Sequence, residues 1–179
     1  MSFPKYLLIA LAFTLTACDD LNPSPDDKRP PVDGSTVGFN VGQIAPDFSL
    51  FDTESNTVTM SAELVSQDGI VLYFTMWCPI CDSHMSHMRA QVIPNYPNVR
   101  FLIVDFVSGT IADSRTAQEN NGYTDMTVLV DNTQEVLNLY NANMGTTVVI
   151  ENAGSHGIVR MNEDYKDSKK LTATLDALP

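Results

Sequence analysis

Two cysteines separated by two residues, Cys78 and Cys81, are the side chains of this sequence best suited to chemistry. The apolar run 70–76 directly before them is typical of a buried strand. Pro79 has the fixed φ angle that suits the first turn of a helix. Cys78 would then lie at the N-terminus of that helix, where unpaired N–H groups and the helix dipole favour a thiolate. We therefore expect Cys78 to be a reactive thiol and Cys81, one turn further on, to be its partner.

The spacing of the pair is compatible with more than one use. A redox-active dithiol is one, and a structural disulfide is another, although closing so short a loop stabilises a fold only slightly. A structural zinc site would need a second pair of ligands at suitable spacing, and Cys18 in the N-terminal segment is the one further cysteine. Copper(I) favours thiolate, imidazole and thioether ligands, and His84 follows the cysteines among methionines. Redox and copper chemistry both stay open on these residues alone.

The rest of the chain must position the pair, and its pattern alternates strands with helices. The sequence predicts strands at 48–52, 57–60, 70–76, 99–107, 127–130, 146–151 and 157–161, with hairpins at both ends of this series. It predicts helices at 61–65, 79–92, 133–140 and 168–178, and a helix or long loop at 111–121. This order favours an α/β fold with a mixed central sheet flanked by helices. The formal net charge of −12 argues against a nucleic-acid partner, because such a partner needs a basic surface.

The first 17 residues have the pattern of a targeting segment. Lys5 precedes an apolar run at 6–15 that is too short to span a bilayer. The next residues, Leu15-Thr16-Ala17-Cys18, resemble the signal of bacterial lipoproteins, which implies a signal peptide at 1–17 and a lipid on Cys18.

Residues 18–38 are rich in Pro, Asp and Ser, so we expect the lipidated cysteine to be followed by a flexible tether. The globular domain is expected at 39–179. The lipoprotein resemblance implies a location in the cell envelope of a Gram-negative-type bacterium, at the inner membrane and facing the periplasm. If Cys18 carries lipid, Cys78 and Cys81 are the remaining pair in an oxidising compartment.

Two stretches, VGQIAPDFSLFD and LYFTMWCPIC, resemble the thioredoxin-like redoxin superfamily over residues 41–179. The likeness is strongest to the TlpA/ResA type of membrane-anchored thiol-disulfide oxidoreductase. It implies a thioredoxin-like fold with an N-terminal β-hairpin extension, and exchange with dithiols or disulfides of periplasmic proteins without a cofactor beyond the cysteine pair. It also implies that Cys78 attacks and Cys81 resolves the mixed disulfide, while Pro79 sets the helix start and Trp77 shapes the site.

The sequence departs from this family pattern at three places. One is Pro79, which follows the first cysteine, whereas TlpA-type proteins more often carry proline before the second. Gly145 stands where these proteins usually carry a cis-proline that faces the cysteines, so we expect Gly145 and Thr146 to form the substrate-binding edge in its place. No acid lies within 70–81, so the usual buried proton acceptor is missing from its expected position. Asp105, at the end of the neighbouring strand, is a weak substitute that we expect to be a solvated strand-end carboxylate.

Resemblances to two other kinds of protein, peroxiredoxins and copper chaperones, suggest alternative functions. Thr75 matches the threonine that orients peroxide in peroxiredoxins, but Val71 and Gly145 stand where that site has a proline and an arginine. Copper chaperones of the Sco type combine a cysteine pair with a distant histidine, for which His156 is the candidate. The copper alternative therefore predicts a ligand set of Cys78, Cys81, His84 and His156.

Overall fold

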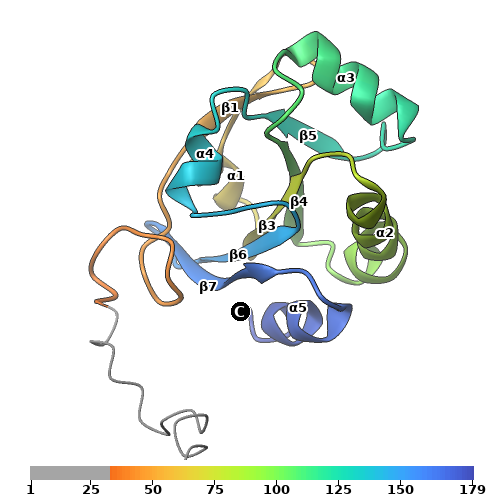
Figure 1. Cartoon of the computed structure of the whole chain (residues 1–179). Coiled ribbons are helices and arrows are strands. Elements are labelled where there is room, and N and C mark those ends of the chain that lie inside the picture. The colour runs from red at the N-terminus through yellow and green to blue at the C-terminus, as the bar shows by residue number, and fades with distance from the viewer. Residues whose placement is uncertain (1–32) are drawn as a thin grey trace, which may run out of the picture. The chain divides into compact units, whose positions relative to one another are not determined.

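The computed structural model describes residues 33–179, which are drawn in colour in Figure 1. The predicted signal peptide, Cys18 and most of the predicted tether lie outside these described residues. Val32–Pro179 forms one compact unit. Within the described part of the chain, no helix is both long and apolar enough to cross a membrane.

A seven-stranded mixed sheet forms the centre of the domain, with strand order β2-β1-β5-β4-β3-β6-β7. The strands are β1 (Ser49–Asp52), β2 (Thr57–Thr59), β3 (Gly69–Thr75), β4 (Val99–Asp105), β5 (Thr127–Val130), β6 (Thr146–Asn152) and β7 (Gly157–Asp164). β3 runs parallel to β4 and antiparallel to β6, and β1 runs antiparallel to both β2 and β5. The predicted mixed α/β sheet with an N-terminal hairpin is thus confirmed.

Within residues 33–179, five α-helices connect and cover the strands (Figure 1): α1 (Met60–Leu64), α2 (Pro79–His87), α3 (Ile111–Asn120), α4 (Glu135–Leu139) and α5 (Ser168–Leu175). The predicted helix at 79–92 is α-helical only as far as His87. A π-helical turn, Met88–Val92, and a short 3-10 turn, Ile93–Asn95, then end it. Pro94 lies in that last turn, and it cannot donate the hydrogen bond that would continue an α-helix.

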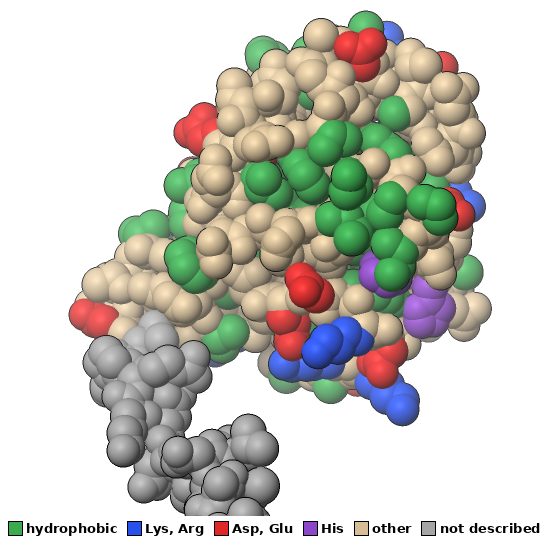
Figure 2. Space-filling model, viewed as in Figure 1, with side chains coloured by type: hydrophobic (Ala, Val, Ile, Leu, Met, Phe, Trp, Pro, Cys, Tyr) green, Lys and Arg blue, Asp and Glu red, His purple; other side chains and the backbone are tan. Residues whose placement is uncertain are grey.

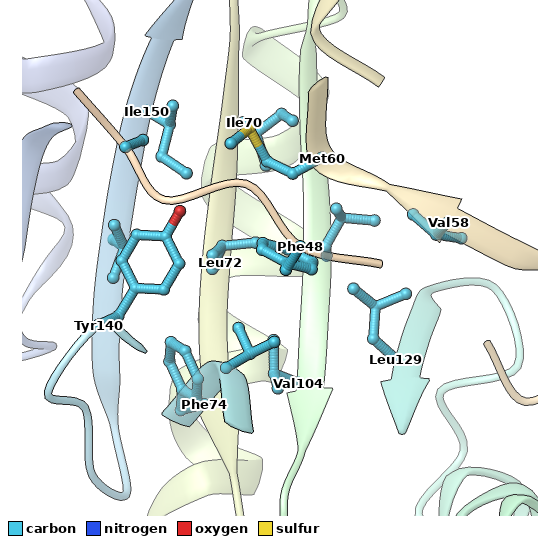
Figure 3. Close-up of a cluster of buried hydrophobic side chains, with 14 of the residues drawn as sticks. Phe48, Val58, Met60, Ile70, Leu72, Phe74, Val104, Leu129, Tyr140 and Ile150 are labelled. Carbon is cyan, nitrogen blue, oxygen red and sulfur yellow. The ribbon is translucent and has the colours of Figure 1, made fainter. Parts of the chain in front are cut away.

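Both faces of the sheet carry a hydrophobic core, and β3 contributes to each of them. All seven β3 residues are buried. Because strand side chains alternate between faces, Leu72 and Phe74 pack on the side of α1 and α4 (Figure 3), whereas Val71 and Tyr73 pack on the side of α2 and α5. A strand covered on both faces needs apolar residues throughout, which explains the uninterrupted run before the cysteines.

Candidate active site

The cysteine pair lies where β3 leads into α2, as the sequence predicts. β3 ends at Thr75, and Cys78 is the N-cap residue of α2 with Pro79 in its first turn. The Cys81 N–H donates to the Cys78 Sγ over 3.3 Å, so the helix N-terminus points a backbone donor at this sulfur. The two sulfurs lie 2.7 Å apart, and both cysteines are free thiols in this structure.

The two thiols differ in access and surroundings. Cys81 is completely buried, whereas Cys78 is partly exposed. Burial disfavours the thiolate of Cys81, but hydrogen bonds from the Cys78 thiol, nearby backbone groups and the Thr75 hydroxyl outweigh it and lower the pKa of Cys81. The surroundings therefore favour the Cys81 thiolate, whereas only the Cys78 sulfur is accessible to another molecule.

Trp77 adopts an unusual backbone conformation directly before Cys78. Its φ angle is +59°, in the left-handed region that bulky residues rarely occupy. Its N–H donates to the Thr75 Oγ1 over 3.1 Å, and its indole Nε1 donates to the Asp105 Oδ2 over 2.8 Å. These two bonds hold the ring against the protein and thereby determine the path of the chain into the first cysteine.

The Asp105 carboxylate that anchors the indole is buried, with 1% of its surface exposed. It also accepts hydrogen bonds from the Ser114 hydroxyl and from the N–H groups of Val107 and Ser108. The expectation of a solvated strand-end carboxylate was therefore wrong. Asp105 holds Trp77 and the loop after β4 in place, and this pairing follows from the parallel register that puts Asp105 beside Thr75.

Tyr73 and His84 lie behind the cysteines, and no role for Tyr73 was predicted from the sequence. Tyr73 is buried, and its hydroxyl lies 3.0 Å from the His84 Nδ1. Burial raises the pKa of Tyr73, and so do the charge and hydrogen bonding of the Cys81 sulfur. Burial, followed by the neighbouring His87, lowers the pKa of His84. Side chains alternate between the two faces of a strand, and this alternation could have shown that Tyr73 faces the helix that carries Cys81.

Gly145 faces this same region from the start of β6. Its φ angle is +86°, and its N–H donates to the Phe74 carbonyl over 2.9 Å. Proline could make neither the angle nor the bond. A Cβ atom at Gly145 would lie 3.9 Å from the His84 ring, so the glycine backbone packs beside the imidazole.

Thr146, the other predicted substrate-binding residue, is buried, and its hydroxyl is hydrogen-bonded to neighbouring residues. Its Oγ1 accepts a hydrogen bond from the Asn143 N–H over 3.0 Å and donates to Asp164 over 3.2 Å. Of the two residues, Gly145 is the one that the structure places beside the site.

His156 lies far from the cysteines, in the turn between β6 and β7. β6 pairs with β3 so that Glu151 lies opposite Gly69, the first residue of β3. His156 therefore lies at the end of the sheet where β3 begins, whereas Cys78 follows the other end, about 20 Å away for seven strand residues. The structure does not bring together the ligand set predicted for copper. No cluster of three or more His, Cys, Asp or Glu side chains in residues 33–179 is placed to hold a metal ion.

An apolar surface accompanies the exposed cysteine. Large hydrophobic side chains exposed on the segments around the pair are Met76, Ile80, Val107 and Met144. Figure 2 shows hydrophobic side chains gathered on a face that also carries histidines. A surface of this kind favours contact with other apolar groups rather than with a highly charged ligand.

Comparison with known proteins agrees with this arrangement. The AhpC/TSA family model matches residues 41–172, and no curated protein matches the chain. A candidate thiol:disulfide interchange protein DsbE from Chlorobium tepidum is similar over 78% of this chain and 98% of its own, with 19% identity and a TM-score of 0.63.

Two further solved structures are similar. A candidate protein disulfide isomerase from Bacteroides thetaiotaomicron covers 79% of this chain and 91% of its own, with 18% identity and a TM-score of 0.63. A candidate thioredoxin from Neisseria meningitidis is similar over 74% of this chain and 87% of its own, with 26% identity and a TM-score of 0.59. These likenesses confirm the thioredoxin-like fold.

Proposed function

The chain belongs to the AhpC/TSA family, whose model spans residues 41–172, and from this premise we propose that it exchanges dithiols and disulfides with partner proteins through Cys78 and Cys81. The observation that carries the proposal is the unequal exposure of two sulfurs only 2.7 Å apart. Cys78 is accessible at a helix N-terminus, and Cys81 is buried directly behind it. One thiol can thus meet a partner while the other waits to resolve the product.

The reaction proceeds in two exchanges. The Cys78 thiolate attacks one sulfur of a partner disulfide, so that a mixed disulfide forms and the partner's other sulfur leaves as a thiolate. Cys81 then attacks the Cys78 sulfur, which closes the Cys78–Cys81 disulfide and releases the second partner thiolate. Two electrons pass from the pair to the partner, and the same steps in reverse oxidise a dithiol.

Trp77, Pro79 and Gly145 support this exchange by shaping the site rather than by reacting. Pro79 begins the helix that points its N-terminus at Cys78, and Trp77 sets the chain path before it. The backbone at Gly145 and the exposed side chain of Met144 provide an edge against which an extended, apolar segment of a partner can lie.

The peroxidase alternative has less support from the geometry. Its threonine should present a hydroxyl to peroxide bound at the attacking cysteine. Here the Thr75 hydroxyl is buried and accepts the Trp77 N–H instead. The copper alternative loses its fourth ligand, because His156 lies at the other end of the sheet. We therefore propose neither as a second function.

Insulin reduction by the full chain in the presence of a thiol reductant tests the proposal. Cys78→Ser should abolish the activity, and Cys81→Ser should accumulate mixed disulfides, because the first exchange then has no resolving step. Ser83→Ala, an exposed change on the same helix, serves as the control and should match the unmodified chain. Full activity in Cys78→Ser would overturn the proposal. The equilibrium redox potential of the Cys78–Cys81 pair then indicates the direction of exchange: a low potential indicates a reductase, and a high potential indicates an oxidase.

We also propose that a lipid on Cys18 anchors the domain in the cell envelope, where it faces periplasmic partners. The proposal rests on the lipoprotein-like residues 15–18 and the polar tether that follows them. Cys18→Ala should move the chain from the membrane fraction to the soluble fraction. Mass spectrometry should show that the Cys18→Ala product lacks the added lipid mass. An unchanged membrane fraction would contradict the anchor.

A further inference from the structure

Cys81 must lose its proton before it can resolve a mixed disulfide, because the thiolate is the nucleophile. In the mixed disulfide the Cys78 thiol no longer donates the hydrogen bond that favours the Cys81 thiolate, so buried Cys81 needs a nearby group to accept its proton. Two aspartates on the segments around the pair are bonded elsewhere: Asp105 accepts the Trp77 indole N–H, and Asp82 accepts the Tyr123 hydroxyl over 2.6 Å. Another acceptor must therefore serve Cys81.

Tyr73 and His84 occupy the position where such an acceptor is needed. Cys81 and His84 are three residues apart on α2, so their side chains lie on neighbouring parts of one helix surface. Tyr73 points from β3 toward this surface, and its hydroxyl lies 3.0 Å from the His84 Nδ1. The charge and hydrogen bonding of the Cys81 sulfur help to raise the pKa of the Tyr73 hydroxyl, so this hydroxyl lies within reach of the thiol as well as of the imidazole.

We infer that Tyr73 and His84 form a proton relay that deprotonates Cys81 during the resolving step; the inference rests on the proposed dithiol–disulfide exchange. The Cys81 proton passes to the Tyr73 oxygen while the Tyr73 proton passes to the His84 Nδ1. The Cys81 thiolate then attacks the Cys78 sulfur, and the bond between Cys78 and the partner breaks. The partner leaves as a thiolate, and His84 gives its proton to solvent.

The ionisation of each group suits its role in the relay. Burial keeps the pKa of Tyr73 high, so the phenol stays neutral and passes a proton on rather than storing charge. Burial also lowers the pKa of His84, so a neutral imidazole is present to accept the proton at neutral pH. Half-buried His84 has the access to solvent that buried Tyr73 lacks.

The groups that face His84 are not acidic. Tyr73 faces it from β3, His87 from the same helix, and Tyr165 from the segment after β7, with ring centroids 4.8 Å apart. Tyr165 has a separate partner, because its hydroxyl lies 2.8 Å from the His87 Nδ1. A second tyrosine–histidine pair thus lies beside the first. Burial and Asp167, not the sulfurs, raise the pKa of Tyr165, so this pair provides a matched control.

An aromatic disulfide that releases a coloured thiolate tests the relay on the full chain, because the two exchanges release it in separate phases. The first phase reports attack by Cys78 and the second reports resolution by Cys81. Tyr73→Phe should leave the first phase within about twofold and slow the second by about 100-fold, as expected for loss of proton transfer. Tyr165→Phe removes the other tyrosine–histidine bond and should leave both phases unchanged.

His84→Gln provides a second variant that can accept the Tyr73 hydrogen bond but cannot take up its proton. In the unmodified chain the second phase should slow as pH falls and His84 becomes protonated. In His84→Gln this dependence should disappear, and circular dichroism should show an intact fold. A normal second phase in both Tyr73→Phe and His84→Gln, or equal slowing in Tyr165→Phe, would overturn the relay. Loss of the first phase in the unmodified chain would overturn the proposed function itself.

Discussion

The bond between the Trp77 indole and Asp105 should contribute measurably to the stability of the domain. The donor and acceptor lie 2.8 Å apart, and the carboxylate is buried. A hydrogen bond to a charged group contributes about 1.5–3 kcal/mol. The left-handed backbone of Trp77 costs about 1–2 kcal/mol, so the bond is of the size needed to offset that strain.

Trp77→Phe, Asp105→Asn and the double variant isolate this contribution. Asn keeps the shape of the side chain, and its oxygen can still accept the N–H groups of Val107 and Ser108. Its amide group then faces the indole donor, so either single change removes the bond. The sum of the two losses in unfolding free energy should exceed the loss in the double variant by about 1.5 kcal/mol or more.

Urea unfolding followed by far-UV circular dichroism measures the three free energies. Trp77→Phe combined with Ser66→Ala is the control, since Ser66 precedes β3 at the opposite end of the sheet and these two losses should add. If the losses for Trp77 and Asp105 also add to within about 0.5 kcal/mol, the two side chains are independent and the argument for an anchored indole is refuted.

Two further predictions concern the groups beside the thiols. Gly145→Ala should lower the unfolding free energy by about 1–2 kcal/mol in urea unfolding, because alanine is strained at a φ of +86°; unchanged stability would contradict this. Burial, with the neighbouring His87, lowers the pKa of His84, so the unfolded chain binds this proton more readily than the folded chain. The unfolding free energy should therefore fall as pH decreases through about 6.5, where an unfolded histidine titrates. His84→Gln should lose this component of the pH dependence, and identical pH slopes for the two chains would contradict it.

The strand-to-helix junction could be predicted from sequence because its signals are local. The apolar run specifies β3, and the cysteine and proline that follow it specify the start of α2 and the position of Cys78. None of these signals requires knowledge of a distant residue. The hairpin of β1 and β2 was predictable for the same reason, since both strands and their turn are contiguous in the chain.

The surroundings of the thiols depend on strand register and could not be predicted. A buried tyrosine within a seven-residue apolar strand has the same pattern as any core residue, so the role of Tyr73 was missed. Asp105 was misjudged because only the parallel pairing of β4 with β3 places it beside Thr75. His156 was grouped with the cysteines because a sequence does not show at which end of a sheet a hairpin turn lies.

The anchored indole also makes the molecule its own optical reporter. Trp77 is the single tryptophan of the chain, so tryptophan emission originates from the residue directly before Cys78. The indole is partly exposed and packs near Tyr123, with ring centroids 6.5 Å apart. Its emission should therefore change when the neighbouring sulfurs form or break a disulfide, or when a partner covers the apolar surface. Redox titrations and partner binding can be followed on the unlabelled protein, at the site where both events occur.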